Sequence, residues 1–129
     1  YAVTFQPVVE NRNDVVTVPA GYVAEVLFAA GDPVVPGTAA YVNNTPLTVA
    51  QSEGVGGGNH DGMHYFAIPG VNPQTGGLLA INHEFPDVNL LFADNRLPNA
   101  ATATSEQRQL LLSAVGVSVI EVQRAANGT

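Results

Sequence analysis

The sequence predicts a mostly-β fold with one short helix, and three patterns support that class. Residues 22–28 and 117–122 each alternate between two faces, of which at least one is apolar. Two apolar runs, 60–69 and 77–84, flank a loop dense in turn-forming residues, which is typical of a β-hairpin. The single helix that the sequence indicates, over 105–114, is too short to cover a sheet alone.

The other elements are weaker. Residues 1–5 form a short alternating run that is compatible with one more strand. Residues 34–59 are rich in glycine and proline, and we expect a flexible loop there. The glycine run at 54–59 resembles a phosphate-binding loop only superficially. It lacks the Lys-Ser/Thr ending, so a linker is the preferred interpretation. The helix should begin with a capping box formed by Thr104 and Gln107.

Composition limits the classes of function. A length of 129 residues suits one domain or a piece of one. Eleven acidic residues oppose four basic ones, for a formal net charge of −7, so we expect no nucleic-acid partner. The absence of cysteine excludes disulfides and thiolate metal ligands. No apolar run is long enough to span a membrane, and we expect any signal peptide to have been removed before Tyr1.

The hairpin brings together the side chains with the most chemistry. If Ile68 faces Gly77 across the turn, antiparallel pairing places Asp61 opposite Glu84. Two further polar side chains would then lie within a residue or two of that pair: His60 and Asn82. Acidic and imidazole groups therefore converge at the open end of the hairpin, far from the turn.

Two interpretations of this convergence are open. Facing carboxylates and an Asn oxygen suit a hard cation such as calcium, whereas His60 or His83 nearby would favour a transition metal or a mixed site. In the structural alternative, Asp61 forms an Asx turn with Gly62 and the other residues simply end a strand. His64 lies inside the predicted strand, where a structural role is more common than metal ligation.

Three segments resemble the N-terminal portion of PhoX-type alkaline phosphatases. They are 60–66 (His-Asp-Gly-Met-His-Tyr-Phe), 77–85 (Gly-Leu-Leu-Ala-Ile-Asn-His-Glu-Phe) and 116–122 (Gly-Val-Ser-Val-Ile-Glu-Val). Segments 18–22 and 30–33 resemble the opening of that family in the same order. The resemblance implies that residues 1–129 form the N-terminal segment of a β-propeller, about one to two blades. It also implies calcium and iron at the active site, and phosphomonoester hydrolysis in the periplasm or outside the cell.

Individual residues carry this resemblance to different degrees. Glu84 matches the glutamate of the family's Asn-His-Glu box and is the first candidate for a metal ligand, with Asn82 beside it. Asp61 matches the aspartate that precedes the paired strand. Some family members have an iron-binding cysteine just before that aspartate. This chain has His60 there, which the resemblance makes a metal ligand or a catalytic residue that positions phosphate.

Length leaves two classes of function open. A propeller of several four-stranded blades needs several hundred residues, so these 129 residues are not expected to be active alone. The first function is a metal-dependent phosphatase, in which the remainder of the propeller completes the site and phosphate monoesters are the substrate. The alternative is a non-enzymatic scaffold or a self-assembling, fibre-forming fragment, because unpaired strand edges associate with other chains or with copies of themselves.

Overall fold

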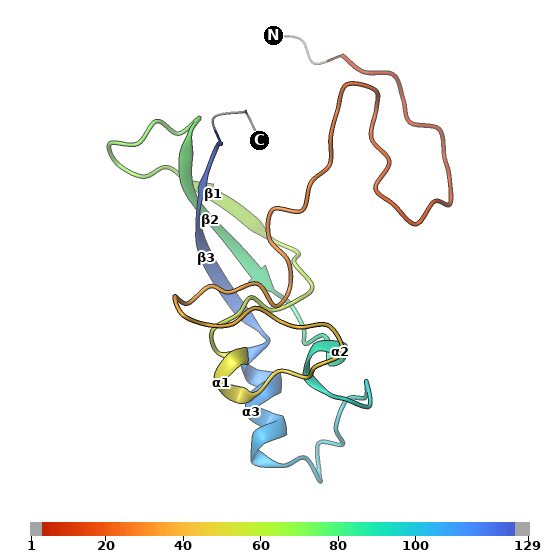
Figure 1. Ribbon diagram of the computed structural model, residues 1–129, viewed down its shortest axis with the longest axis vertical. Helices are drawn as coiled ribbons and strands as arrows, with labels where there is room; N and C mark the ends of the chain where they lie inside the picture. The colour runs from red at the N-terminus through yellow and green to blue at the C-terminus, as the bar shows by residue number, and fades with distance from the viewer. Residues whose placement is uncertain (1–3, 126–129) are drawn as a thin grey trace.

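The computed structural model describes residues 4–125, which form a three-stranded antiparallel sheet beside a group of short helices (Figure 1). The sheet order is β1-β2-β3. The prediction of a mostly-β chain is confirmed in part, since the chain consists mainly of coil around this small sheet. The elements in chain order are α1 (Val49–Ser52), β1 (Met63–Phe66), β2 (Gly76–His83), α2 (Val88–Leu91), α3 (Ser105–Ser113) and β3 (Gly116–Gln123).

The hairpin, the capped helix and the final strand are confirmed. β1 and β2 form the hairpin, and β3 pairs with the other side of β2 over its full length. α3 begins at the predicted capping box. The Thr104 hydroxyl accepts a hydrogen bond from the backbone N–H of Gln107, and the Gln107 side-chain oxygen accepts one from the backbone N–H of Thr104. The same chemistry starts α1, where Thr48 and Gln51 form a second capping box inside the expected loop. Apart from α1, residues 34–59 are irregular, as predicted.

The predicted hairpin register is wrong by one residue. Phe66 pairs with Leu78 and Met63 with Ile81, so Asp61 is not directly opposite Glu84. A one-residue slip in an antiparallel pair moves each side chain to the opposite face relative to its partner strand. The difference arises in the loop, because β1 ends at Phe66 and β2 begins at Gly76.

The strand predicted at 22–28 does not form. These residues lie in an N-terminal arm, residues 4–27, that contains no helix or strand and extends away from the sheet (Figure 1). Val23 and Val26 are 81% and 83% exposed. Alternation shows that a segment suits a sheet, but a strand also needs a neighbour for its backbone hydrogen bonds, and here none lies alongside. The strand suggested at 1–5 lies partly outside the described residues, and Thr4 and Phe5 are not in a strand.

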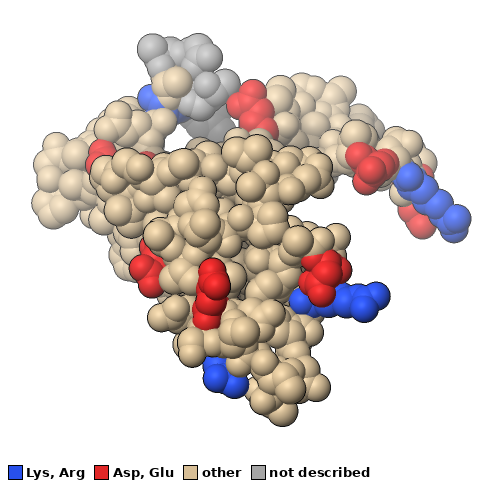
Figure 2. Space-filling view, turned by 60° about the horizontal axis from the view of Figure 1, so that its bottom comes forward, with Lys and Arg blue, Asp and Glu red and all other residues tan. Residues whose placement is uncertain are grey.

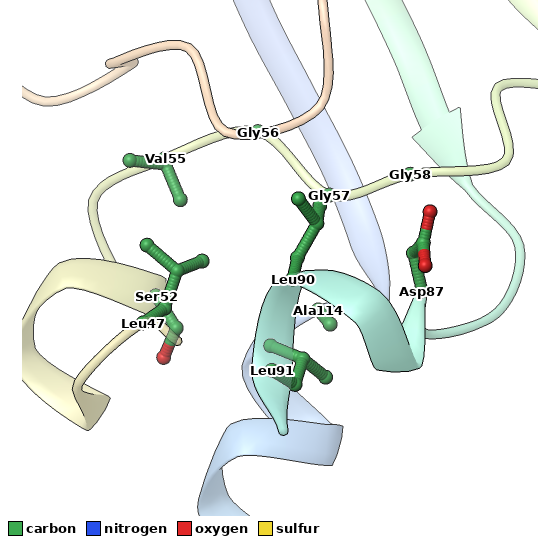
Figure 3. A pocket seen from close by; sticks show the side chains of 10 residues that line it. All are labelled: Leu47, Ser52, Val55, Gly56, Gly57, Gly58, Asp87, Leu90, Leu91 and Ala114. Atoms are coloured by element: carbon green, nitrogen blue, oxygen red, sulfur yellow. The ribbon is translucent and has the colours of Figure 1, made fainter. Parts of the chain in front are cut away.

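The main apolar core lies among the helices rather than against the sheet. It consists of Leu47, Val55, Leu91, Phe92, Leu110 and Ala114. Figure 3 shows the glycine run, Gly56 to Gly58, crossing above α2, with Leu90 pointing toward it. The cavity beneath is about 10 Å³, room for roughly one water molecule and none for a substrate. The glycine run is buried, so it is a packed element rather than a free linker.

The two faces of the sheet differ in burial. The inner face carries Ile81, His83 and Ser118, which are all buried. The outer face carries Phe66, Val117 and Val119, which are 51%, 67% and 57% exposed. Much of the surface visible in Figure 2 is uncharged, and some of the acidic and basic side chains lie next to one another.

The accessible surface is large for the mass of the chain. It measures 9509 Å², whereas a folded monomer of 13.4 kDa exposes about 6,500 Å². The surplus of about 3,000 Å² on this one chain exceeds the roughly 1,000–2,500 Å² that each partner of an obligate interface buries. No helix within residues 4–125 is long and apolar enough to cross a membrane.

Candidate metal centre at the open end of the hairpin

Asn82 ties the two sides of the hairpin together beyond the end of β1. Its Oδ1 accepts hydrogen bonds from the backbone N–H groups of Asp61 at 3.0 Å and Gly62 at 2.6 Å. The backbone N–H of Asn82 donates to the Gly62 carbonyl at 3.0 Å. A carboxamide oxygen has two lone pairs, and both are engaged here. Asn82 therefore positions Asp61, while the ligand role predicted for Asn82 itself stays untested.

The two carboxylates lie at the surface on either side of this clamp. Asp61 and Glu84 are both exposed, and neither side chain has a hydrogen-bond or ion-pair partner within residues 4–125. The backbone of Glu84 is held by a bond from its N–H to the Asn59 carbonyl at 3.2 Å. Asn59 in turn donates from its side chain to the Phe85 carbonyl at 3.0 Å. Both carboxylates are thus free acceptors on an anchored backbone.

His83 lies on the inner face and is only 6% exposed. Its Nε2 is 2.7 Å from the Ser118 hydroxyl on β3, whereas its Nδ1 is buried without a hydrogen-bond partner among the described residues. Burial, followed by repulsion from His60, lowers the pKa of His83 below its ordinary value. The ring is therefore neutral at pH 7.

His60 is held from two sides. Its Nε2 is 2.9 Å from the Gly57 carbonyl oxygen, and the Phe28 ring stacks on it, with centroids 5.4 Å apart and planes 10° from parallel. The His60 and His83 rings are neighbours, with centroids 5.1 Å apart. His64 lies elsewhere, on the exposed outer face in edge contact with Phe66. The structure thus brings two of the three histidines together and separates the third.

Close packing explains why glycines precede His60. A side chain at Gly56 would collide with the Phe28 ring, and one at Gly57 would collide with the Ala114 carbonyl and His83. The chain can approach the two imidazoles this closely only without a Cβ. Sequence reasoning missed Phe28, Gly57 and Ser118 as parts of this site. Only the shared face of Ser118 and His83 could have been found from alternation, once β3 was paired in register.

The donor types suit the expected metals, but the set is incomplete. Carboxylate oxygens match calcium, and imidazole matches iron. Within residues 4–125 no three His, Asp or Glu side chains gather closely enough to hold a metal ion. The clamp on Asp61 and the bonded ring of His60 are the kind of secondary support that ligands normally have.

Comparison with known proteins decides the family. The family model for alkaline phosphatase PhoX matches residues 3–129. The chain belongs to the PhoX family. A solved structure, Pseudomonas fluorescens PhoX in complex with vanadate, a transition state analogue, matches with a TM-score of 0.73 and 34% sequence identity. That match covers 85% of this chain but only 18% of the Pseudomonas protein. A comparison with curated protein sequences gave no match.

Membership of the PhoX family gives the small sheet its context. PhoX is a propeller protein, and the chain corresponds to part of it. The sheet β1-β2-β3 is therefore a part of a larger fold, which agrees with its uncovered outer face.

Proposed function

We propose that residues 1–129 are the N-terminal part of a metal-dependent phosphomonoesterase that uses calcium and iron and acts in the periplasm or outside the cell. The observation that carries this proposal is the match to PhoX over residues 3–129, supported by structural agreement with a relative that binds vanadate. Phosphate monoesters are the proposed substrates, and the rest of the propeller supplies the ligands that this segment lacks.

In this proposal Asp61 and Glu84 hold metal. Both are exposed, unpaired carboxylates on backbone that hydrogen bonds fix in place, so their oxygens are available at little cost in side-chain rearrangement. Asn82 keeps Asp61 at the open end of the hairpin. His60 binds metal or positions the phosphate, as a catalytic residue. When bound, the cations would neutralise phosphate oxygens and activate an attacking oxygen.

The proposal is tested by Glu84→Gln in the protein as the cell makes it. The change keeps the size of the side chain and removes its negative charge, so we expect loss of bound metal and a fall in p-nitrophenyl phosphate turnover of at least tenfold. Metal content by mass spectrometry and turnover are measured together. Glu53→Gln, at the exposed end of α1, is the matched control and should change neither. Full metal content with full turnover in Glu84→Gln would remove Glu84 from the site.

A non-enzymatic scaffold or self-assembling fragment is the second candidate function. The observation favouring it is the surplus of accessible surface together with the exposed apolar residues of the outer face. Intact mass of purified natural material distinguishes the two candidates. A mass near 13.4 kDa without a companion polypeptide supports the scaffold, and a much larger chain or co-purifying fragment supports the enzyme.

A further inference from the structure

We propose that a hollow between the turn at 41–46, helix α2 and the turn at 92–95 binds a neutral, hydroxyl-rich ligand of about the size of one hexose unit. The hollow has a volume of about 260 Å³, close to the roughly 300 Å³ at which small-molecule sites begin. None of His60, Asp61 and Glu84 lines it. The proposal therefore concerns a second site and does not depend on the proposed function.

Four asparagines give the hollow its chemical character. They come from three separate segments of the chain and are Asn43, Asn44, Asn89 and Asn95. No charged side chain lines the hollow, and its wall is more polar than apolar. A carboxamide carries both donors and an acceptor, so it can bond a hydroxyl group in either direction. An anion would need a cationic partner here, and a metal ion would need carboxylates or imidazoles.

These four side chains differ from asparagines that shape the chain elsewhere. The side-chain oxygens of Asn72, Asn82 and Asn99 all accept hydrogen bonds from backbone N–H groups. The four carboxamides around the hollow have no side-chain hydrogen-bond partner within residues 4–125. Their hydrogen-bonding capacity is not used by the turns themselves, and it is available to a ligand.

Backbone hydrogen bonds hold the three segments in place. Leu47 donates from its backbone N–H to the Leu90 carbonyl at 3.0 Å, which ties the end of the first turn to α2. The backbone N–H of Phe92 donates to the Val88 carbonyl at 2.9 Å, and that of Asn95 donates to the Phe92 carbonyl at 3.0 Å. The hollow is thus formed before a ligand arrives, so little ordering entropy opposes binding.

Two aromatic residues complete the lining. Phe92 belongs to the apolar core and is 8% exposed, and the half-buried Tyr41 packs against that core. The Tyr41 hydroxyl accepts from the backbone N–H of Asn44 at 3.2 Å, and its own proton has no acceptor within residues 4–125. Aromatic surface beside uncharged donors and acceptors suits a sugar ring, which presents C–H groups as well as hydroxyls.

The test measures sugar binding by the protein as the cell makes it. The probes are the methyl glycosides of glucose, galactose and mannose, followed by saturation-transfer NMR and calorimetric titration. We expect at least one to bind with a Kd of about 1 mM, because so small a ligand makes few contacts. Methyl glucuronoside, which carries a carboxylate, should bind about tenfold more weakly, since no cation lines the hollow. Binding of free hexoses but not of the methyl glycosides would indicate a free sugar rather than the end of a glycan.

Variants locate the binding. Asn43→Ala and Asn89→Ala each remove one exposed carboxamide and should raise the Kd about fivefold, and the double variant should bind no glycoside measurably. Asn13→Ala is the matched control, because Asn13 is exposed in the N-terminal arm and its side chain also has no hydrogen-bond partner among the described residues. It should leave the Kd unchanged. Turnover of p-nitrophenyl phosphate should be the same in all of these variants.

Three results would overturn the proposal: no binding of any neutral hexose or glycoside well above the expected Kd, unchanged binding in the double variant, or equal binding of the charged glycoside. The first result would also be found if another segment of the complete protein fills the hollow. Failure of the phosphatase proposal gives a different result. A protein that binds a glycoside through Asn43 and Asn89 but hydrolyses no phosphate monoester would refute the phosphatase and leave the sugar site standing.

Discussion

The N-terminal arm and the β1–β2 hairpin began as the same prediction and ended as different structures. Residues 22–28 alternate between two faces, and the hairpin has two apolar runs around a turn-rich loop; both patterns predict strands. The hairpin pairs with itself and with β3, and Ile81 at its centre is only 2% exposed. Residues 4–27 have no paired strand, and nearly all of them are exposed.

The difference shows that alternation specifies a face and not a strand. In the hairpin, β1 pairs with β2, which follows it after a short loop, so the backbone hydrogen bonds form between segments that are near in sequence. The arm has no such partner strand within residues 4–125, and most of its apolar side chains are exposed. We infer that the arm and the outer face of the sheet are surfaces for further polypeptide, in keeping with the fraction of PhoX that this chain spans.

The largest expected effect contrasts a central residue of each region. Ile81→Ala removes a buried side chain from the sheet and should lower the free energy of unfolding by about 3 kcal/mol. Val23→Ala, in the arm, should change it by less than about 0.5 kcal/mol because the side chain is 81% exposed. Denaturant unfolding measures both. Equal costs would mean that the arm is packed as firmly as the hairpin.

The second effect is a pH dependence confined to the hairpin. The folded-state pKa of His83 lies below the ordinary value of 6.5 because burial disfavours the charged ring, and His60 repels it further. At a pH between the folded-state pKa and the ordinary pKa of His83, the unfolded chain binds a proton that the folded chain does not. This contribution to stability is therefore complete above pH 6.5 and is lost as the pH falls, at no more than about 1.4 kcal/mol per pH unit.

This pH dependence is tested by replacing the buried His83 and, as a control, the exposed His64. Unfolding is followed from neutral to mildly acidic pH in wild type, His83→Gln and His64→Gln. The slope should flatten in His83→Gln and persist in His64→Gln, because His64 is exposed. A slope that is identical in all three proteins would assign the pH dependence to other groups.

The smallest effect asks whether the arm has any structure of its own. Phe5 and Tyr22 make an edge contact with ring centroids 6.0 Å apart. Tyr22→Leu should remove about 0.5 kcal/mol and raise the rate of proteolysis within the arm about twofold, with no change in the hairpin. Limited proteolysis with peptide mapping gives the rates. An unchanged rate in the arm would show that this contact does not restrain it.

Local signals explain which parts of the fold were predicted from the sequence. The capping box at Thr104 and Gln107 and the turn-rich loop of the hairpin act within a few residues, and both appear as expected. The register failed because it depended on exactly where the loop ends, and a one-residue error reverses the faces. α1 was missed although Thr48 and Gln51 carry the same capping signal, because the surrounding glycine and proline favoured a loop.

The contacts that support the candidate site residues could not be predicted from the sequence. Sequence spacing proposed His60, Asp61, Asn82 and Glu84 as site residues, and their ligand roles stay predictions; the structure adds that Asn82 holds the backbone of Asp61 and Gly62. The contact of Phe28 with His60 joins residues far apart in the chain, and no local pattern encodes it. The glycine run looked like a linker, because absence of side chains indicates either flexibility or close packing, and only the neighbours decide which.

Light scattering of the 129-residue chain tests the central claim most directly, namely that its uncovered surfaces require further polypeptide. We predict a mass above 13.4 kDa that rises with protein concentration, because about 3,000 Å² of surplus surface is available for association. A chelator should loosen the association if Asp61 and Glu84 share a cation with the partner. A monodisperse, cooperatively folding monomer of 13.4 kDa that is indifferent to the chelator would contradict the account.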